Sequence, residues 1–137
     1  MRPDSEGLHM HEEQIDAFRT AVEDGDSDGV LATFADDITF NNPVTFHPFE
    51  GKETTAVVVP RLLEVWRDLH YVAELRGDGI IGLVFDARVG DRDARGIDLL
   101  RFDDDGLIAE ITVMVRPLSG LQALAAEMAA ALASGSE

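Results

Sequence analysis

The chain contains no cysteine, so disulfide bonds and thiolate chemistry contribute neither to its fold nor to its function. It has no apolar run long enough to cross a bilayer, and its first residues do not follow the layout of a signal peptide. Positive charge is scarce, because 11 Lys and Arg residues stand against 27 Asp and Glu residues, for a formal net charge of −16. Such a surface repels nucleic-acid phosphates and anionic membranes. We therefore expect a cytoplasmic protein that binds neither, and whose partners are small molecules or proteins.

The length of 137 residues fits one domain of ordinary size. Residues 1–9 show no periodicity and are expected to form a flexible tail. Residues 10–133 are expected to form the domain, and residues 134–137 a flexible C-terminus.

Hydrophobic periodicity predicts the elements of the first half. Helical spacing predicts a helix over residues 10–23 and a short second helix that reaches Phe34. Alternation predicts a strand over residues 38–42. Residues 52–68 combine β-branched side chains with helical spacing, and we interpret them as a helix kinked at Pro60.

Strand-like runs separated by turns rich in Gly and Asp follow over residues 70–76, 80–89, 94–103 and 107–116. Such short connections imply antiparallel neighbours. A capping-box pattern at Ser119 and Gln122 then introduces a helix over residues 121–132. This order predicts an α+β fold, in which a cone-shaped, curved, mixed but mostly antiparallel β-sheet carries the N-terminal helices over its concave face, with a further helix at the C-terminus.

An acidic residue interrupts one of these strands, in the segment Ile97-Asp98-Leu99-Leu100-Arg101-Phe102. Strand alternation places Asp98 on the same side as Leu100 and Phe102. A carboxylate among apolar side chains is costly unless it is hydrogen-bonded, faces a polar cavity or stays protonated, and when protonated it donates a hydrogen bond. Asp98 is therefore the main candidate for a functional group.

Residues 25–37, 42–44 and 50–52, together with the Asp98 strand and residues 105–108, resemble the nuclear transport factor 2-like superfamily. The most similar branches are the SnoaL-like polyketide cyclases and the ketosteroid isomerases. The resemblance extends from residue 10 to about residue 132. It implies the cone-shaped fold, a small-molecule pocket and pairing of two copies through the sheet.

Only part of the isomerase pattern is present in this chain. The resemblance places Asp98 where those isomerases keep a protonated acid in the oxyanion hole, an arrangement that the isomerases themselves exemplify. It places Asn42 at the position of their proton-shuttling aspartate, and an amide cannot act as a general base. It places Phe18 at the position of their oxyanion tyrosine, which removes a hydrogen-bond donor. Classical ketosteroid isomerase activity is therefore not expected.

Strand parity, together with the resemblance, suggests which side chains line the pocket. They are mostly apolar, as in other small-molecule sites. The predicted set is Phe18, Phe34, Asn42, Trp66, Phe85, Leu100, Phe102, Ile111 and Val113. The alternative is a filled core, in which Asp98 only accepts hydrogen bonds from a helix end or from Asn42. The open pocket is preferred because a closed apolar core does not tolerate an unpaired carboxyl group.

Histidines offer one further catalytic candidate. His47 lies in the loop expected at the mouth of the cone, and histidine is the side chain best suited to replace a missing base at neutral pH. His70 begins a strand and is expected to be structural. The His and Glu residues at 9–13 have no distant partner with ligand spacing, so no metal site and no cofactor are expected.

The opposite face of the last strands is more apolar than a solvated face should be. It carries Ile97, Leu99, Arg101, Thr112, Met114 and Arg116. We expect a sheet-to-sheet homodimer with the arginines in interfacial ion pairs.

Three functions remain open: an isomerase, cyclase or hydratase acting on a polyketide- or steroid-like carbonyl compound through Asp98, a non-catalytic protein that binds a small apolar molecule, and a homodimerisation module with a filled cone.

Overall fold

The computed structural model describes residues 11–135 of the chain, and the tail expected over residues 1–9 lies outside them. The elements are α2 (Glu12–Asp24), α3 (Ser27–Ala32), β1 (Phe34–Asn41), β2 (Phe49–Glu50), α4 (Lys52–Val65), β3 (Arg67–Gly77), β4 (Ile80–Val89), β5 (Arg92–Phe102), β6 (Ile108–Arg116) and α5 (Leu118–Gly135). No helix in the described part of the chain has both the length and the apolar character needed to cross a membrane.

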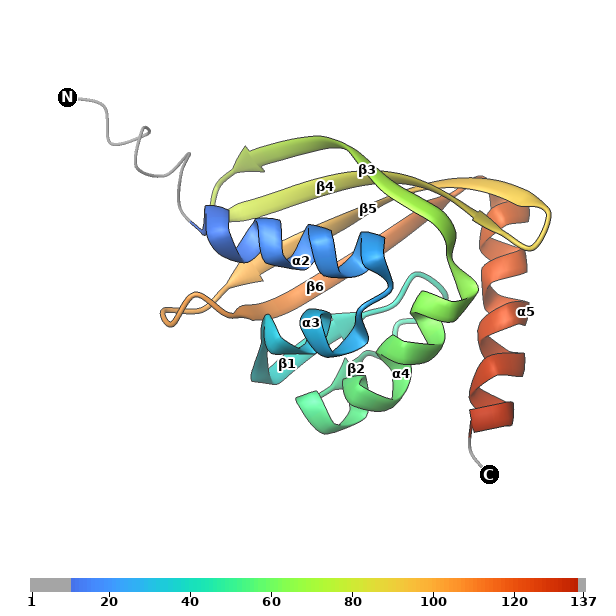
Figure 1. Cartoon of the computed structure of the whole chain (residues 1–137), viewed down its shortest axis with the longest axis horizontal. Helices are drawn as coiled ribbons and strands as arrows, with labels where there is room; N and C mark the ends of the chain where they lie inside the picture. The colour runs from blue at the N-terminus through green and yellow to red at the C-terminus, as the bar shows by residue number, and fades with distance from the viewer. Residues whose placement is uncertain (1–10, 136–137) are drawn as a thin grey trace.

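The described strands form one six-stranded sheet in the order β2-β1-β6-β5-β4-β3. β1 and β6 run parallel, and all other neighbours run antiparallel. Helices α2, α3 and α4 lie on one side of this curved sheet, and α5 stands at one end of it (Figure 1). The predicted α+β fold with a mixed, mostly antiparallel sheet is confirmed.

The two N-terminal helices are separated by a turn that glycine makes possible. Gly25 ends α2 in the left-handed region at φ 70°, where glycine is favoured. Asp26 then caps α3, because its side chain accepts a hydrogen bond from the backbone N–H of Gly29 at 3.0 Å. The buried side chains that fix α2 are Ile15, Phe18 and Ala21.

Several predicted boundaries were wrong. The second helix ends at Ala32, and Phe34 opens β1 instead, because its backbone pairs with Ile108 of β6. The C-terminal helix begins at Leu118, so Ser119 lies inside it and not at a cap. The predicted helix over residues 52–68 is present as α4 with Pro60 inside it, and it ends at Val65. The short strand β2, which pairs with β1, was not predicted.

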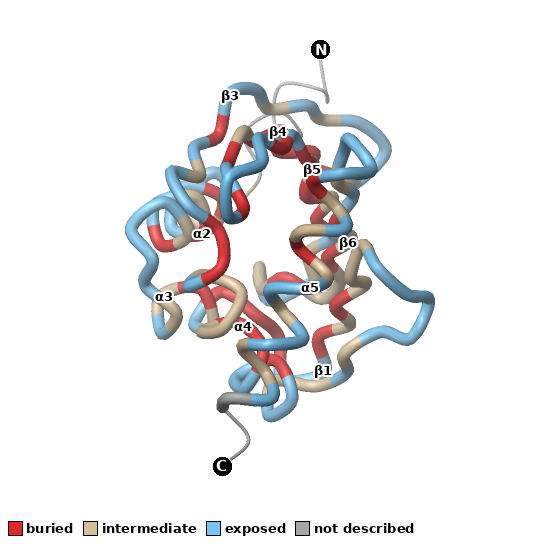
Figure 2. Tube along the Cα trace, turned by 90° about the vertical axis from the view of Figure 1, so that its right-hand side faces the viewer, coloured by how far each residue is buried: buried red, intermediate tan, exposed pale blue. Residues whose placement is uncertain are grey.

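The core lies on the inner side of the sheet, as the burial of alternate strand residues shows (Figure 2). In β5 the buried residues are Ala94, Gly96, Asp98 and Leu100. Gly96 leaves room for the ring of Phe85, because a Cβ atom there would overlap that ring and lie 2.8 Å from the carbonyl oxygen of Met114. Phe85 in turn meets Trp66 and Tyr71 edge to face, with ring centroids 5.3 and 6.0 Å away.

Candidate functional site

Asp98 lies in the middle of β5 and is only 6% exposed. Its Oδ2 atom accepts a hydrogen bond of 2.7 Å from the hydroxyl group of Tyr71 on β3. Its Oδ1 atom accepts none from the described residues. No fully enclosed side-chain oxygen or nitrogen in the described part of the chain lacks a partner, and the carboxyl group of Asp98 borders a small cavity.

The environment sets the protonation of both groups. Burial raises the pKa of Asp98 to about 7, although the hydrogen bond from Tyr71 acts to lower it. Burial and the neighbouring Asp98 raise the pKa of Tyr71 well above its ordinary value, so Tyr71 remains a donor. Near neutral pH Asp98 is therefore present in both its protonated and its ionised form. In the protonated form, a carboxyl group whose Oδ2 accepts from Tyr71 carries its proton on Oδ1 and has a hydrogen bond to donate.

Tyr71 is held from several sides, and it was missed among the predicted site residues. Its backbone N–H donates to Oε2 of Glu23 at 2.8 Å, and the guanidinium carbon of Arg19 lies 5.7 Å from its ring centroid. Its ring packs against Phe18 and Phe85. It is the only tyrosine of the chain and stands in a predicted strand. The sequence does not show that its hydroxyl group crosses β4 to reach Asp98 on β5.

The inner cavity beside Asp98 and Tyr71 is small, about 40 Å³. Its other walls are apolar side chains of α2, α3, α4 and the strands. Six of the predicted pocket residues line it: Phe18, Phe34, Trp66, Phe85, Ile111 and Val113. Two others lie elsewhere. Leu100 is fully buried in the core. Phe102 is half-buried and its ring stacks on His11 with ring centroids 4.3 Å apart, and the β5–β6 pairing is irregular between Arg101 and Phe102.

A larger outer cavity of about 410 Å³ lies between α4, α5 and the loop after β1. Its lining is apolar except for the loop residues Asn42, Thr45 and His47. α5 contributes Leu124, Ala125, Met128, Ala129 and Leu132. The side chains that border both cavities, and so form the boundary between them, are Phe40, Leu62, Trp66 and Val113.

The amide group of Asn42 is used to fold this loop. Its Oδ1 accepts from the backbone N–H groups of Val44 and Thr45 at 3.0 and 2.9 Å, and its Nδ2 donates to the carbonyl oxygen of His47 at 2.9 Å. The side chain that hydrogen-bonds Asp98 is therefore Tyr71 and not Asn42. His47 is exposed and lines the outer cavity, whereas Asp98 lines the inner one.

Comparison with known proteins assigns the family. Residues 15–111 match the SnoaL-like domain. The chain belongs to the SnoaL-like domain family. The predicted nuclear transport factor 2-like and ketosteroid isomerase-like fold is confirmed. No curated protein is a significant match.

Solved structures agree with this assignment. A steroid delta-isomerase from Pseudomonas aeruginosa is 37% identical, with 90% of this chain and 92% of that chain covered and a TM-score of 0.85. An uncharacterised protein with a cystatin-like fold from Silicibacter pomeroyi is 28% identical, with coverages of 90% and 86% and a TM-score of 0.83. A third structure is a hypothetical protein with a ketosteroid isomerase-like fold from Catenulispora acidiphila, in complex with trimethylamine. It is 16% identical, with 84% of this chain and 93% of that chain covered and a TM-score of 0.64, and it supports the fold alone.

The outer face of this SnoaL-like domain carries the residues expected to pair two copies. Met114 is 50% exposed, and Ile97 and Leu99 are half-buried. Arg101 lies 3.7 Å from Glu110 of its own chain. Homodimerisation stays a prediction.

Within residues 11–135, no group of three or more His, Asp or Glu side chains is placed to hold a metal ion.

Proposed function

We propose that this SnoaL-like protein binds a small, mostly apolar molecule whose carbonyl or enol oxygen is held by Asp98. The observation that carries the proposal is a buried carboxyl group at the wall of the inner cavity, with Oδ2 on the hydroxyl group of Tyr71 and Oδ1 without a partner among the described residues. With a pKa of about 7, Asp98 can donate a hydrogen bond at neutral pH. The relationship to a protein named steroid delta-isomerase supports a carbonyl compound as ligand.

The cavities support this ligand class by size and charge. The outer cavity of about 410 Å³ has the size of an ordinary small-molecule site and suits an apolar body. The inner cavity of about 40 Å³ has room only for the oxygen-bearing end. Neither cavity is lined by Lys or Arg. A carboxylate ligand would therefore lose its hydration without gaining a cationic partner.

The chemistry that fits is stabilisation of an enolate. Donation from Oδ1 of Asp98 to a carbonyl oxygen lowers the cost of the negative charge that develops there when a neighbouring carbon loses a proton. That charge arises in isomerisations and cyclisations of carbonyl compounds and in additions of water to unsaturated ones. The proton must go to a base, and His47 is the imidazole that lines the outer cavity.

The second candidate function is ligand binding without turnover. Asn42 favours this function, because the resemblance places it at the position of the isomerase base and an amide cannot act as a base. The amide group is also already hydrogen-bonded to three backbone groups of its loop.

Calorimetric titration with 1-tetralone, a neutral aromatic ketone, tests the binding site. A ketone accepts a hydrogen bond from protonated Asp98 only, so the affinity of the wild type should fall about 30-fold between pH 6 and pH 8.5. Asp98→Asn keeps a donor at every pH, and its affinity should not depend on pH. Asp98→Leu should bind at least tenfold more weakly than the wild type at pH 6. Equal affinity of the wild type and Asp98→Leu at pH 6 would contradict the proposal.

Proton exchange separates an enzyme from a binding protein. 2-Tetralone is incubated in D2O with the wild type, Asp98→Asn or His47→Gln, and the loss of the α-proton signal is followed by NMR. If the protein is an enzyme, the wild type should exchange the α-proton faster than buffer alone does. Each of the two variants should exchange it more slowly than the wild type. If 1-tetralone binds but no variant or wild-type protein accelerates exchange, ligand binding without turnover is the function.

A further inference from the structure

Glu23 is a carboxylate at a place where a helix does not favour one. It lies in the last turn of α2, next to Asp24, and that turn contains no basic residue. The C-terminal end of a helix carries partial negative charge, so acidic side chains there are unfavourable for the helix itself. The role of Glu23 therefore lies in a contact outside α2.

That contact is with the backbone of Tyr71. Oε2 of Glu23 accepts a hydrogen bond of 2.8 Å from the N–H group of Tyr71. β3, which carries Tyr71, lies at one edge of the sheet, so one of its sides has no neighbouring strand to accept such hydrogen bonds. Glu23 supplies the missing acceptor at this point of the edge.

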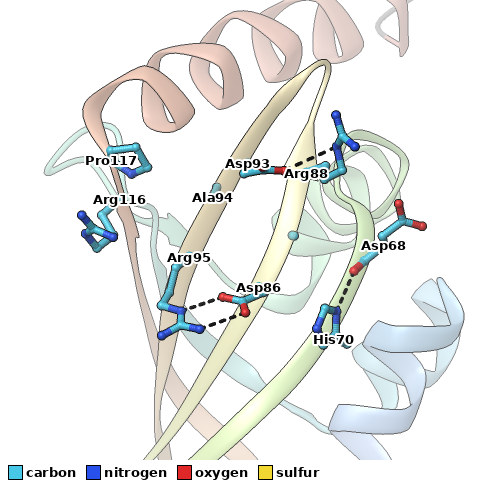
Figure 3. Close-up of a pocket in the computed structure, with 10 residues that line it drawn as sticks. Asp68, His70, Asp86, Arg88, Asp93, Ala94, Arg95, Arg116 and Pro117 are labelled. Atoms are coloured by element: carbon cyan, nitrogen blue, oxygen red, sulfur yellow. Dashed lines mark hydrogen bonds and ion pairs between the residues drawn. The ribbon is translucent and has the colours of Figure 1, made fainter.

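Tyr71 stands between two irregularities in the pairing of β3 with β4. The register shifts between Arg67 and His70, and again between Tyr71 and Ala73. Just before Tyr71, Asp68 adopts the left-handed conformation at φ 54°, and Nδ1 of His70 lies 3.0 Å from the carbonyl oxygen of Asp68 (Figure 3). Irregular pairing re-aims side chains, so the direction of the Tyr71 side chain depends on contacts beyond the strand ladder.

A second contact joins α2 to the same part of β3. Nη1 of Arg19 donates to Oε1 of Glu74 at 3.2 Å, and the guanidinium carbon of Arg19 lies 5.7 Å from the ring centroid of Tyr71. The charged groups that act on Tyr71 are thus Arg19 and Glu23 of α2, together with Asp98 of β5. Of these, Glu23 is the one that holds its backbone.

We propose that Glu23 is a positioning residue of the Asp98 site, which holds the backbone of Tyr71 so that its hydroxyl group stays on Oδ2 of Asp98. That hydroxyl group reaches across β4 and makes the hydrogen bond of 2.7 Å. With Oδ2 occupied, a protonated Asp98 carries its proton on Oδ1, where the proposed ligand would accept it. This inference rests on the proposed function for the role of Asp98, but its test needs no ligand.

Removal of Glu23 should affect Asp98 in a direction that separates position from charge. Burial raises the pKa of Asp98 and the hydrogen bond from Tyr71 acts against it, so loss of that bond should raise the pKa further. Loss of the negative charge of Glu23 acts in the opposite direction, because a like charge favours the protonated form of a carboxyl group. Glu23→Gln removes the charge but keeps an oxygen that can accept from Tyr71, whereas Glu23→Ala removes both.

The readout is the midpoint of the Asp98 titration, measured in each variant by 13C NMR of the carboxyl carbon. In Glu23→Ala the midpoint should rise by at least about 0.5 pH unit, toward the value of Tyr71→Phe. In Glu23→Gln it should stay within about 0.2 pH unit of the wild type. Asp24→Ala is the matched control, because it removes the adjacent carboxylate of the same helix turn, and its midpoint should not rise.

Two results would overturn the proposal. One is a midpoint in Glu23→Ala that is equal to or lower than that of the wild type. The other is an equal rise in Glu23→Ala and Glu23→Gln, which would show that the acceptor oxygen is not what matters. Glu23 is exposed, so circular dichroism should remain native, and Glu23→Ser, whose shorter side chain does not reach the N–H group, should repeat the rise.

The outcome is separate from that of the ligand titrations. Absence of 1-tetralone binding would contradict the proposed function and leave the midpoints of the Glu23 variants unchanged. Binding of 1-tetralone together with an unmoved midpoint in Glu23→Ala would contradict the role of Glu23 alone.

Discussion

Replacement of Asp98 by asparagine should change how the stability of the protein depends on pH. The pKa of Asp98 is about 7 in the folded protein, against an ordinary value of 3.8. Between these values the folded protein keeps a proton that the unfolded chain has released, so the stability that Asp98 contributes falls as pH rises through this window. It is fully present below pH 3.8, and it is lost once pH exceeds about 7. Asparagine does not titrate and has no such dependence.

The expected magnitude follows from this difference in pKa. Each pH unit within the window costs about 1.4 kcal/mol. Between pH 5.5 and 8.5, the free energy of unfolding of the wild type should therefore fall by about 2 kcal/mol relative to Asp98→Asn, with most of the change below pH 7.5. All other titrating groups are common to the two proteins and cancel in the difference.

Urea unfolding followed by the fluorescence of Trp66, the only tryptophan, measures this difference at four pH values between 5.5 and 8.5. Asp86→Asn is the matched control, because the hydrogen bonds from Arg95 lower the pKa of Asp86 and place its titration below this range. Its stability relative to the wild type should be constant from pH 5.5 to 8.5. A constant difference for Asp98→Asn as well would refute the assignment of a protonated, buried carboxyl group.

Three further substitutions test other parts of the site. Tyr71→Phe removes the hydrogen bond that lowers the pKa of Asp98, so the titration midpoint in NMR should rise above 7, and urea unfolding at pH 8 should show a loss of about 1–3 kcal/mol. Gly96→Ala should cost about 1–3 kcal/mol in the same assay, because the ring of Phe85 must move; unchanged stability would contradict the packing. Ala125→Phe should fill the outer cavity and abolish calorimetric binding of 1-tetralone while circular dichroism remains native, and an affinity within twofold of the wild type would place the ligand elsewhere.

The fold could be predicted because its signals are local. Alternation and Gly-Asp turns mark the antiparallel strands β3 to β6, and the buried side of β5 follows from the alternation around Asp98. Phe34 shows where such reasoning fails. Its helical spacing from Val30 is less important than its pairing with Ile108, which lies far away in the sequence.

The site could be predicted only in part, for the same reason. Burial of a carboxyl group on a strand is visible in the sequence, but its partner Tyr71 is 27 residues away and reaches it across another strand. The division into a 40 Å³ and a 410 Å³ cavity depends on how Trp66 and α5 pack, which no local pattern determines. The alternation of side chains along β5 predicted that Phe102 faces the pocket. The β5–β6 pairing is irregular between Arg101 and Phe102, so this alternation cannot be extended to Phe102.

The titration of the Asp98 side-chain carboxyl carbon by 13C NMR, with and without saturating 1-tetralone, tests the central claim most directly. The account predicts a midpoint near pH 7 in the free protein. Because a neutral ketone binds only the protonated form, the midpoint should move upward when the ligand is bound. A midpoint near the ordinary value of 3.8, or one that saturating ketone leaves unchanged, would contradict a carboxyl group that holds the ligand oxygen.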